Sequence, residues 1–282
     1  MKVMVVASQK GGGGKTATTC QLAYYLLDLT VPTLLLDLDM QMNATRCMLR
    51  GRVAAVARFS TTQVFEGHRS ALPAGDLVLV PADQGLGELE RQPQRHNDFV
   101  NALQAFLQEV APRFRVCLID THPSPDVRYV AALATADLVL SPIVLTQEAL
   151  EGVGAFLHHP RHGYLRIRER LNPRLELVGL LPNMVEATPF QRANLRQLVE
   201  QHPGLLIPVQ RGEVAGYALI PTRTAIAEAQ AAGVPLWQLR QAAPAGAAKA
   251  AGAMPLRSAA RDAWREIRPS FEAIARRLGV GG

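Results

Sequence analysis

The sequence has few cysteines and no long hydrophobic run. Its three cysteines, Cys20, Cys47 and Cys117, form no C-x-x-C pair, and their odd number argues against a framework of disulfides. No stretch reaches the roughly 20 apolar residues of a membrane-spanning helix. The N-terminal apolar run is short and ends in polar residues and glycines, unlike a secretory signal peptide. We therefore expect a protein of the reducing cytoplasm.

Lysine is also scarce, at only 4 of the 30 basic residues. Two of the four, Lys10 and Lys15, lie in one glycine-rich stretch, which indicates that a compact ammonium group is needed at both positions. The net charge of +6 is uneven: residues 1–150 carry 13 basic and 14 acidic side chains, a balance of −1, and residues 151–282 carry 17 and 10, a balance of +7. A polyanionic partner and a merely solvated arginine-rich face both fit this distribution.

The length and composition predict one large folded domain over residues 1–282. Hydrophobic residues make up 48% and charged residues 19% of the chain, which is enough apolar material for a full core. Short apolar runs predict strands, and amphipathic segments between them predict helices. The predicted strands are 2–7, 33–39, 76–83, 115–123, 136–144 and 175–183, and the predicted helices are 15–28, 97–111, 126–135, 147–158 and 189–202. Such alternation predicts a twisted, mostly parallel sheet with helices on both faces, a three-layer α/β sandwich.

The last part of the chain has two contrasting segments. Residues 241–255 are mostly alanine, glycine and proline, and we expect a flexible stretch. Over residues 256–279, apolar side chains recur at helical spacing and draw one stripe, which we interpret as core packing and not as a partner groove. The stripe is Trp264, Ile267, Phe271, Ile274 and Leu278. Pro269 is predicted to kink or split this helix.

Residues 8–16, "SQKGGGGKT", lie between a predicted strand and a predicted helix and end like a phosphate-binding loop. Consecutive glycines let backbone N–H groups turn towards phosphate oxygens, and the helix N-terminus adds its positive dipole end. Lys15 is predicted to reach the β- and γ-phosphates and Thr16 to ligate Mg²⁺. The sequence therefore predicts ATP and Mg²⁺ as cofactors, bound in a P-loop NTPase fold.

Aspartates end two of the predicted strands. Asp120 ends "VCLID" in the manner of a Walker-B residue, which supplies a carboxylate near Mg²⁺. Asp37 and Asp39 end the strand 33–39 two residues apart, so both side chains lie on one side of it. Asp39 is nearer the strand's end and better placed to orient water, whereas Asp37 is expected to cap or pair. The predicted metal site comprises Thr16, Asp39 and Asp120.

The segments "KGGGGKT", "LLLDLDMQMNATR" and "CLIDTHPSPD" resemble the ParA/MinD family of deviant-Walker-A ATPases, in particular its ParA-type DNA partition branch. The family's loop reads K-G-G-x-G-K-T, so Lys10 is part of its normal spelling. In that family the extra lysine reaches across a dimer interface to the ATP of the partner subunit. A cation supplied in this way stabilises the charge that develops during phosphoryl transfer.

The resemblance extends over nearly the whole chain and implies a set of site residues. "GLLPNMVEAT" (179 to 188) resembles the strand whose end meets the adenine base, and "IPTRTAIAEAQAAGVPL" (220 to 236) resembles the stretch before the C-terminal helix. The implied catalytic residues are Lys10, Lys15, Asp39 and Asp120. The implied nucleotide-binding residues are Lys10, Gly11, Gly12, Gly13, Gly14, Lys15, Thr16, Ala17, Asn183 and Pro208.

Several positions depart from the family pattern. Met40 and Met42 replace the proline and glycine of D-x-D-P-Q-G-N, and His122 replaces a proline after Asp120. Because these changes alter the backbone choices beside Asp39, we expect a slow or partner-dependent ATPase. His122 is interpreted as structural. His158, His159 and His162 are assigned to a helix end on the surface, because no ligand set with metal spacing joins them.

By resemblance, the protein would bind ATP, form a homodimer around two nucleotides, coat non-specific DNA of the nucleoid, and release it when a ParB-like centromere-binding protein stimulates hydrolysis. Basic side chains of the C-terminal half are the DNA candidates. They are Arg192, Arg196, Arg223, Arg265 and Arg268. The first strand starts at residue 2, so we expect no operator-reading domain. Two alternatives stay open: a MinD-type membrane-cycling ATPase, although no stable membrane association is expected, and an accessory ATPase for conjugation, protein positioning or cofactor assembly.

Overall fold

A computed structural model describes residues 1–8, 10–211, 214–240 and 257–281. Its main sheet has eight strands in the order β10-β7-β6-β1-β5-β2-β4-β3, and every neighbouring pair is parallel. The strands are β1 (Lys2–Val6), β2 (Thr33–Asp37), β3 (Ala55–Val56), β4 (Leu77–Val80), β5 (Val116–Asp120), β6 (Leu138–Val144), β7 (Glu176–Val185) and β10 (Ile220–Pro221). A separate antiparallel hairpin joins β8 (Pro208–Arg211) to β9 (Val214–Tyr217).

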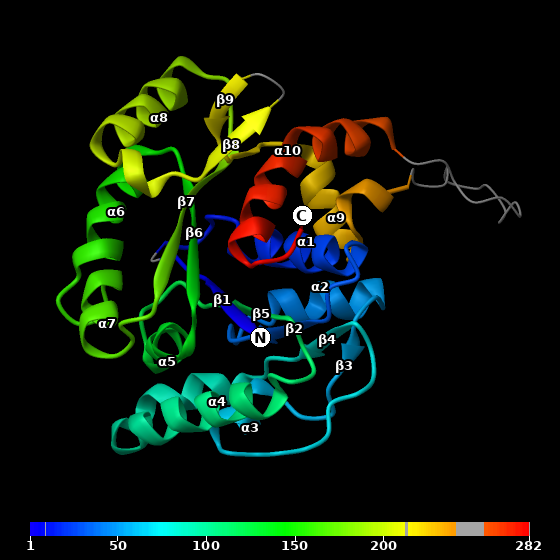
Figure 1. The fold of residues 1–282 in the computed structure, drawn as a ribbon, viewed down its shortest axis with the longest axis vertical. Helices are drawn as coiled ribbons and strands as arrows, with labels where there is room; N and C mark the ends of the chain where they lie inside the picture. Colours follow the sequence, from blue (N-terminus) through cyan, green and yellow to red (C-terminus); the bar gives the residue numbers. More distant parts are fainter. Residues whose placement is uncertain (9, 212–213, 241–256, 282) are drawn as a thin grey trace, which may run out of the picture.

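Helices cover both faces of this sheet (Figure 1). One face carries α1 (Lys15–Asp28), α2 (Asn43–Gly51), α9 (Thr224–Ala232) and α10 (Ser258–Arg277). The other carries α3 (Thr61–Phe65), α4 (His96–Val110), α5 (Val127–Thr135), α6 (Gln147–His158), α7 (Tyr164–Arg170) and α8 (Pro189–Gln201). Short 3₁₀ turns lie at η1 (Gln84–Arg91), η2 (Pro93–Arg95), η3 (Pro203–Leu205) and η4 (Leu236–Gln238).

The sheet separates two hydrophobic cores. Along β1, Val3 and Val5 face the core beneath α3 to α8, and Met4 and Val6 face the core beneath α1, α2, α9 and α10. This division follows from the two-residue period of a strand, because successive side chains point to opposite faces. Both faces of β1 are apolar, as expected of a parallel strand buried on both sides. The predicted three-layer fold is confirmed.

Several predicted bounds shift by a few residues, and two departures bear on the argument. The strand predicted over 33–39 ends at Asp37, because Asp39 turns back and its N–H binds the Asp37 carboxylate. The C-terminal helix is not split: α10 continues through Pro269. The apolar stripe of α10 packs into the core as predicted, with only Trp264 half-buried. The stretch 241–255 lies outside the described residues.

Candidate nucleotide-binding site

The glycine loop connects β1 to α1 and leaves the start of α1 open. Gly12 and Gly14 have φ angles of 77° and 78°, in the left-handed region that glycine tolerates best. Among the described residues no side chain caps α1, so the N–H groups of its first turn face the loop without a side-chain acceptor. A Cβ at Gly14 would lie 2.0 Å from Asn183 Nδ2. The geometry is that of an anion site at a helix N-terminus.

Lys15 is held inside this loop. Its side chain is buried, and Nζ lies 3.4 Å from Ser8 Oγ and 3.3 Å from the Lys10 carbonyl oxygen, to both of which it donates. Burial lowers the pKa of Lys15, whereas the charges of Asp120 and Asp39 raise it. The ammonium group therefore lies between the carboxylates and the glycine backbone, where phosphate oxygens would compensate its charge.

Asp120 ends β5 beneath the start of α1 and is fully buried. Thr16 Oγ1 donates to Asp120 Oδ2 over 2.7 Å, and Thr19 Oγ1 donates to Oδ1 over 3.1 Å. Burial, with a contribution from Asp37, raises the pKa of Asp120 to about 8, and hydrogen bonds from both threonines and the charge of Lys15 oppose the rise. A hydroxyl and a carboxylate side by side form a hard oxygen donor set, which fits Mg²⁺.

Asp37 and Asp39 have different environments. Asp37 is fully buried and accepts hydrogen bonds from the Asp39 N–H (3.0 Å) and from the N–H (2.8 Å) and hydroxyl (2.7 Å) of Thr45. Burial raises the pKa of Asp37 to about 6 despite these bonds. The carboxylate of Asp39 accepts only the N–H of Gln41 among the described residues and lies near enough to Lys15 to act on its pKa. Asp37 thus holds the loop between β2 and α2 in place, and Asp39 is the carboxylate of this loop that lies near Lys15.

The loop after Asp39 carries backbone strain at Met42. Met42 has a φ of 56° and is the N-cap of α2. The left-handed conformation is costly for a side chain with a Cβ, and the family pattern has glycine at this position. The methionine therefore keeps the loop geometry that glycine would adopt, at some cost in stability.

Lys10 lies on its own subunit in this structure. Its Nζ donates to the carbonyl oxygen of Glu148 in the first turn of α6, and its aliphatic stem lies beside Gly152. The residue is exposed. Its predicted action on a second subunit stays a prediction.

A cavity of about 800 Å³ opens beside the loop, within the size range of a nucleotide site. Its walls come from the start of α1, one side of α2, the ends of β6 and β7, and the β10–α9 segment. Asn183 is in the wall, but its amide is engaged: Nδ2 donates to the Gly13 carbonyl oxygen (2.9 Å), and Oδ1 accepts the Met184 N–H (2.8 Å). Four predicted nucleotide-binding residues line this cavity, namely Gly14, Thr16, Ala17 and Asn183.

Pro208 does not line this cavity. It lies on β8, in the hairpin opposite Tyr217. The chain contains a second Ile-Pro pair at 220–221, and β10 places it in the wall, with Ile220 opposite Asn183. Sequence reasoning missed several other wall residues, although the quoted segment "IPTRTAIAEAQAAGVPL" (220 to 236) contains two of them. They are Arg46, Cys47, Met184, Thr222 and Ala227.

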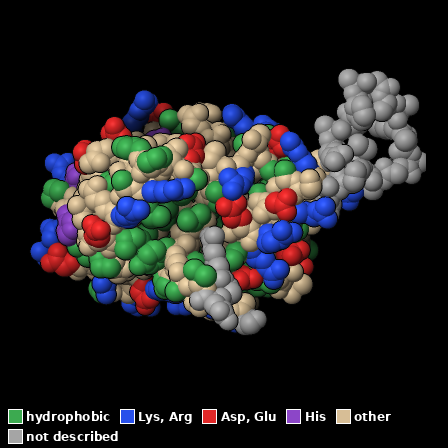
Figure 2. Space-filling model, turned by 90° about the horizontal axis from the view of Figure 1, so that it is seen from above, with side chains coloured by type: hydrophobic (Ala, Val, Ile, Leu, Met, Phe, Trp, Pro, Cys, Tyr) green, Lys and Arg blue, Asp and Glu red, His purple; other side chains and the backbone are tan. Residues whose placement is uncertain are grey.

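The five candidate DNA-binding arginines lie on different elements. Arg192 and Arg196 are exposed on α8, and no ion pair to them is found among the described residues. Arg223 lines the nucleotide cavity and pairs with Glu266 over 2.7 Å. Arg265 and Arg268 on α10 pair with Asp262 (3.4 Å) and Glu272 (2.8 Å). Seen from above, basic side chains are interspersed with acidic ones around an apolar stretch (Figure 2).

The histidines set aside from the sequence lie apart from the loop. His122 is half-buried, and its Nδ1 accepts the N–H of Ser124 over 3.1 Å. His159 follows α6 directly, and its ring stacks on that of His162 at 3.4 Å between centroids. This stacking places the two rings face to face, which is not an arrangement for chelating one ion.

A glycine loop with a buried lysine, and a threonine and an aspartate paired beneath it on a parallel sheet, define a P-loop nucleotide-binding protein. A family model described as "AAA domain" matches residues 1–177. The chain is 32% identical over 251 residues to protein IncC of Escherichia coli, covering 86% of this chain and 64% of IncC. It is 31% identical to the chromosome-partitioning ATPase Soj of Thermus thermophilus, covering 86% and 89%. The chain therefore belongs to the ParA/MinD family of P-loop ATPases, in its partition branch.

A solved structure gives the same fold. Cobyrinic acid a,c-diamide synthase of Mycobacterium smegmatis, with bound ADP and magnesium, is 27% identical and superposes with a TM-score of 0.66 over 83% of this chain and 91% of that one. Whereas the chain spans most of Soj, it spans less than two thirds of IncC.

Proposed function

We propose that this chain is an ATP-dependent DNA partition ATPase. It binds ATP with Mg²⁺, forms a nucleotide-sandwich homodimer, binds DNA without sequence preference, and hydrolyses ATP slowly until a ParB-like centromere-binding protein stimulates it. The observation that carries the proposal is the hydrogen bond from Thr16 to the buried Asp120 beneath an uncapped glycine loop that holds two lysines. The names of IncC and Soj support the partition role.

The residues divide the work of nucleotide binding. Backbone N–H groups of the loop and of the first turn of α1 bind phosphate oxygens, and Lys15 neutralises part of their charge. Thr16 and Asp120 would hold Mg²⁺, which would neutralise charge on the phosphate oxygens. Asp39 orients the attacking water at the mouth of the site. Hydrolysis without a partner is slow in this proposal.

Lys10 is the residue that would make the site depend on dimerisation. In the monomer it is exposed and bound to one carbonyl oxygen of α6. A hydrogen bond from a charged donor is worth at most about 1.5–3 kcal/mol, and water competes for this exposed ammonium group, so the side chain can leave the carbonyl for the phosphates of the partner's ATP. When Lys10 leaves the neutral carbonyl oxygen and binds the charged phosphates of the partner's ATP, it gains a stronger hydrogen bond. This gain links ATP binding to dimerisation.

Lys10→Ala tests this role. We expect ATP binding to stay within about threefold of the wild type, while ATP-driven dimerisation, measured by sedimentation velocity, is lost. Lys2→Ala, an exposed lysine on β1, is the matched control and should dimerise normally. Equal loss of ATP binding and dimerisation in Lys10→Ala would refute action across the interface.

DNA binding is assigned first to α8. Arg192 and Arg196 are one helical turn apart and exposed, and they are free of carboxylate partners among the described residues. Arg223, Arg265 and Arg268 must give up ion pairs before they contact phosphates. We therefore expect the double change Arg192→Ala with Arg196→Ala to weaken DNA binding more than Arg265→Ala with Arg268→Ala, and to reduce its salt dependence.

The membrane-cycling alternative is disfavoured by α10. Its apolar stripe is packed against the sheet, so it has no apolar face left to insert into a bilayer. Within the described residues no helix has both the length and the apolar character to cross a membrane. We propose a cytoplasmic protein that associates with the nucleoid, and binding to anionic liposomes in place of DNA would contradict that proposal.

A further inference from the structure

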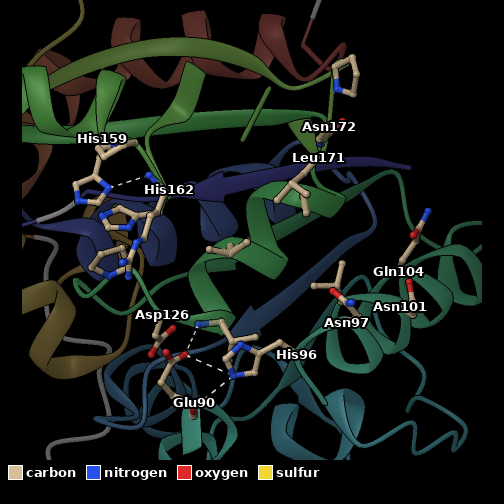
Figure 3. Close-up of a pocket in the computed structure, with 18 of the residues that line it drawn as sticks. Glu90, His96, Asn97, Asn101, Gln104, Asp126, His159, His162, Leu171 and Asn172 are labelled. Atoms are coloured by element: carbon tan, nitrogen blue, oxygen red, sulfur yellow. Dashed lines mark hydrogen bonds and ion pairs between the residues drawn. The ribbon is translucent and has the colours of Figure 1, made fainter. Parts of the chain in front are cut away.

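A second cavity lies on the other face of the sheet. It has a volume of about 1090 Å³ and is bounded by η1, α4, the start of α5 and residues 159–174, and we call it the α4–α5 cleft (Figure 3). It shares no lining residue with the nucleotide cavity. At this volume the cleft is too large for a single small anion and suits an extended segment of a few residues.

One wall of the α4–α5 cleft offers amide groups. Asn97, Asn101 and Gln104 follow one another on α4 at spacings of four and three residues, so they form a row along one helix face. All three are exposed, and no hydrogen bond to their side chains is found within the described part of the chain. Amides both donate and accept, so such a row matches the alternating N–H and C=O groups of a peptide backbone.

The uncompensated charge of the cleft is positive. Arg161 and Arg174 stand in its opposite wall, and within the residues that the structure describes neither has a carboxylate partner. The ring nitrogens of His96, His159 and His162 add further hydrogen-bonding groups. The carboxylates in the lining are already occupied, as the next contacts show.

Both carboxylates of the cleft hold the N-terminus of α5. Glu90 Oε2 accepts the N–H of Val127 over 2.7 Å. Asp126 is the N-cap of α5, accepting the N–H of Arg128 over 3.0 Å, and it also pairs with the Arg128 side chain. Arg128 compensates the charge of Asp126, whereas Glu90 keeps its charge beside the start of α5. Because both arginines of the opposite wall have no carboxylate partner among the described residues, the lining still carries a net positive charge, which favours an acidic ligand.

The same contacts connect the cleft to the loop that carries Asp39. Arg128 is buried, and its Nη1 donates to the Leu38 carbonyl oxygen over 3.3 Å. Glu90 lies near the end of η1, and Gln84 at the start of η1 donates from Nε2 to the Met40 carbonyl oxygen over 3.3 Å. Arg128 of α5 therefore holds the backbone before Asp39, and Gln84 of η1 holds the backbone after it. Both α5 and η1 also line the cleft.

We propose that the α4–α5 cleft docks an acidic segment of a partner protein, and that docking is relayed through Glu90 and Arg128 to the loop that carries Asp39. The amide row holds the backbone of the segment, and Arg161 and Arg174 pair with its carboxylates. Val100, Val130 and Leu171 supply apolar contacts between them. The relay rests on the proposed ATPase function, whereas the docking does not.

Docking is tested without nucleotide. The probe is a fluorescein-labelled decapeptide of alternating glutamate and serine, with a lysine–serine decapeptide as its counterpart, and fluorescence anisotropy measures binding. We expect the acidic peptide to bind and the basic one not to bind, with at least tenfold weaker binding in Arg161→Glu with Arg174→Glu. The control, Arg168→Glu with Arg170→Glu, makes the same change of charge on α7 outside the cleft. Equal weakening in the control, absence of acidic binding, or preference for the basic peptide would overturn the proposal.

The relay is tested by hydrolysis. We expect the acidic peptide to change the ATPase rate of the wild type severalfold, and to leave the rate of Glu90→Ala unchanged although the variant still binds the peptide. Glu90 is a positioning residue in this account, so its loss should separate binding from response. A response retained in Glu90→Ala would overturn the relay. A wild type that binds the peptide but never hydrolyses ATP would instead refute the proposed function and leave the docking site intact.

Discussion

The two ends of the nucleotide cavity are built in different ways. The phosphate end comes from neighbouring strands β1, β2 and β5 and the helix that follows β1, and its charged groups are buried and joined by short hydrogen bonds. The base end collects single residues from α2, β7, β10 and α9, and the Arg223–Glu266 pair beside it is partly exposed. From this comparison we expect phosphate binding to depend on a few irreplaceable groups and base binding to be spread over many contacts.

The largest loss is expected at the phosphate end, from Lys15→Ala. The change removes the one ammonium group buried in the described loop and leaves Asp120 without its counter-charge. We expect the affinity for ATP to fall at least about 100-fold, the effect of losing a buried charge-assisted contact to phosphate. Calorimetric titration measures it, with Lys2→Ala as control. Affinity within a few-fold of the wild type would mean that the loop does not bind phosphate as described.

Gly14→Ala disturbs the close approach of Asn183 to the glycine loop, which joins the phosphate end of the cavity to the base end. A Cβ at Gly14 meets Asn183 Nδ2 at 2.0 Å, and its φ of 78° is unfavourable for alanine. We expect a loss of about 2–4 kcal/mol in the free energy of unfolding, measured by urea denaturation, from steric overlap and backbone strain together. Gly11→Ala is the control, because a Cβ there meets nothing within 4 Å. Equal losses of unfolding free energy in the two variants would show that Asn183 does not lie close to Gly14.

Asp120→Asn should remove the part of the pH dependence of stability that Asp120 causes in the absence of nucleotide. The pKa of Asp120 rises from 3.8 to about 8 on folding, so the unfolded chain releases this proton first. Stability is therefore full below about pH 4 and is lost as the pH rises to about 8. We expect Asp120→Asn to be more stable than the wild type at pH 8.5, by on the order of 1–3 kcal/mol, and to approach it at pH 5.

Urea denaturation at the two pH values checks this difference, with Asp28→Asn as control because Asp28 is not part of the buried cluster. The gain in stability of Asp120→Asn at pH 8.5 must come with loss of Mg²⁺-dependent ATP binding, because the Asp120 carboxylate is also the proposed ligand of the ion. Parallel pH profiles for the wild type and Asp120→Asn would contradict the buried, proton-binding state of Asp120.

A smaller effect is expected at the base end from Ala227→Trp. Ala227 lines the cavity on α9, so an indole there should occupy base volume and weaken ATP binding about tenfold, or about 1.4 kcal/mol. Ala232→Trp, on the same helix but outside the cavity lining, should bind ATP normally. Titration with ATP and with tripolyphosphate distinguishes binding at the base end from binding at the phosphate end. Tripolyphosphate has no base, so its affinity for Ala227→Trp should equal its affinity for the wild type. If Ala227→Trp binds ATP as the wild type does, the base lies elsewhere.

The smallest effect is expected from Met42→Gly. Glycine relieves the left-handed strain at φ 56° but gains freedom in the unfolded chain, so we expect a net stabilisation of about 0.5–1 kcal/mol. Met40→Gly is the control and should destabilise, because Met40 packs against the core as Met42 does but is not in the left-handed region, so glycine relieves no strain there. Thermal unfolding measures both. Destabilisation by Met42→Gly would mean that the side chain contributes more than the strain costs.

The phosphate end could be predicted from the sequence and much of the base end could not. The helix predicted over 15–28 has the observed bounds, because the glycine loop, the apolar period and the helix start are all encoded within neighbouring residues. By contrast, Pro208 and Pro221 belong to identical Ile-Pro pairs, and only the long-range pairing of Ile220 with Asn183 selects the second one. Local sequence does not contain that pairing.

The helix through Pro269 shows the same limit. Local rules predict a break, since proline lacks an N–H and crowds the preceding turn. In the structure Ser270 Oγ accepts the N–H of Leu219 and donates to its carbonyl oxygen, both over 3.0 Å, and Phe271 is buried against the α1 side of the sheet. These tertiary contacts hold the residues after the proline in place, and they outweigh the local preference.

The central claim is that ATP switches this chain onto DNA. Its most direct test is binding to a non-specific duplex, measured by fluorescence anisotropy with ATP, with ADP and without nucleotide, each across a salt series. The account predicts binding with ATP alone, weakening steeply as salt rises because arginines displace counterions from phosphates. DNA binding that is absent, or that is the same in all three nucleotide states, would contradict it.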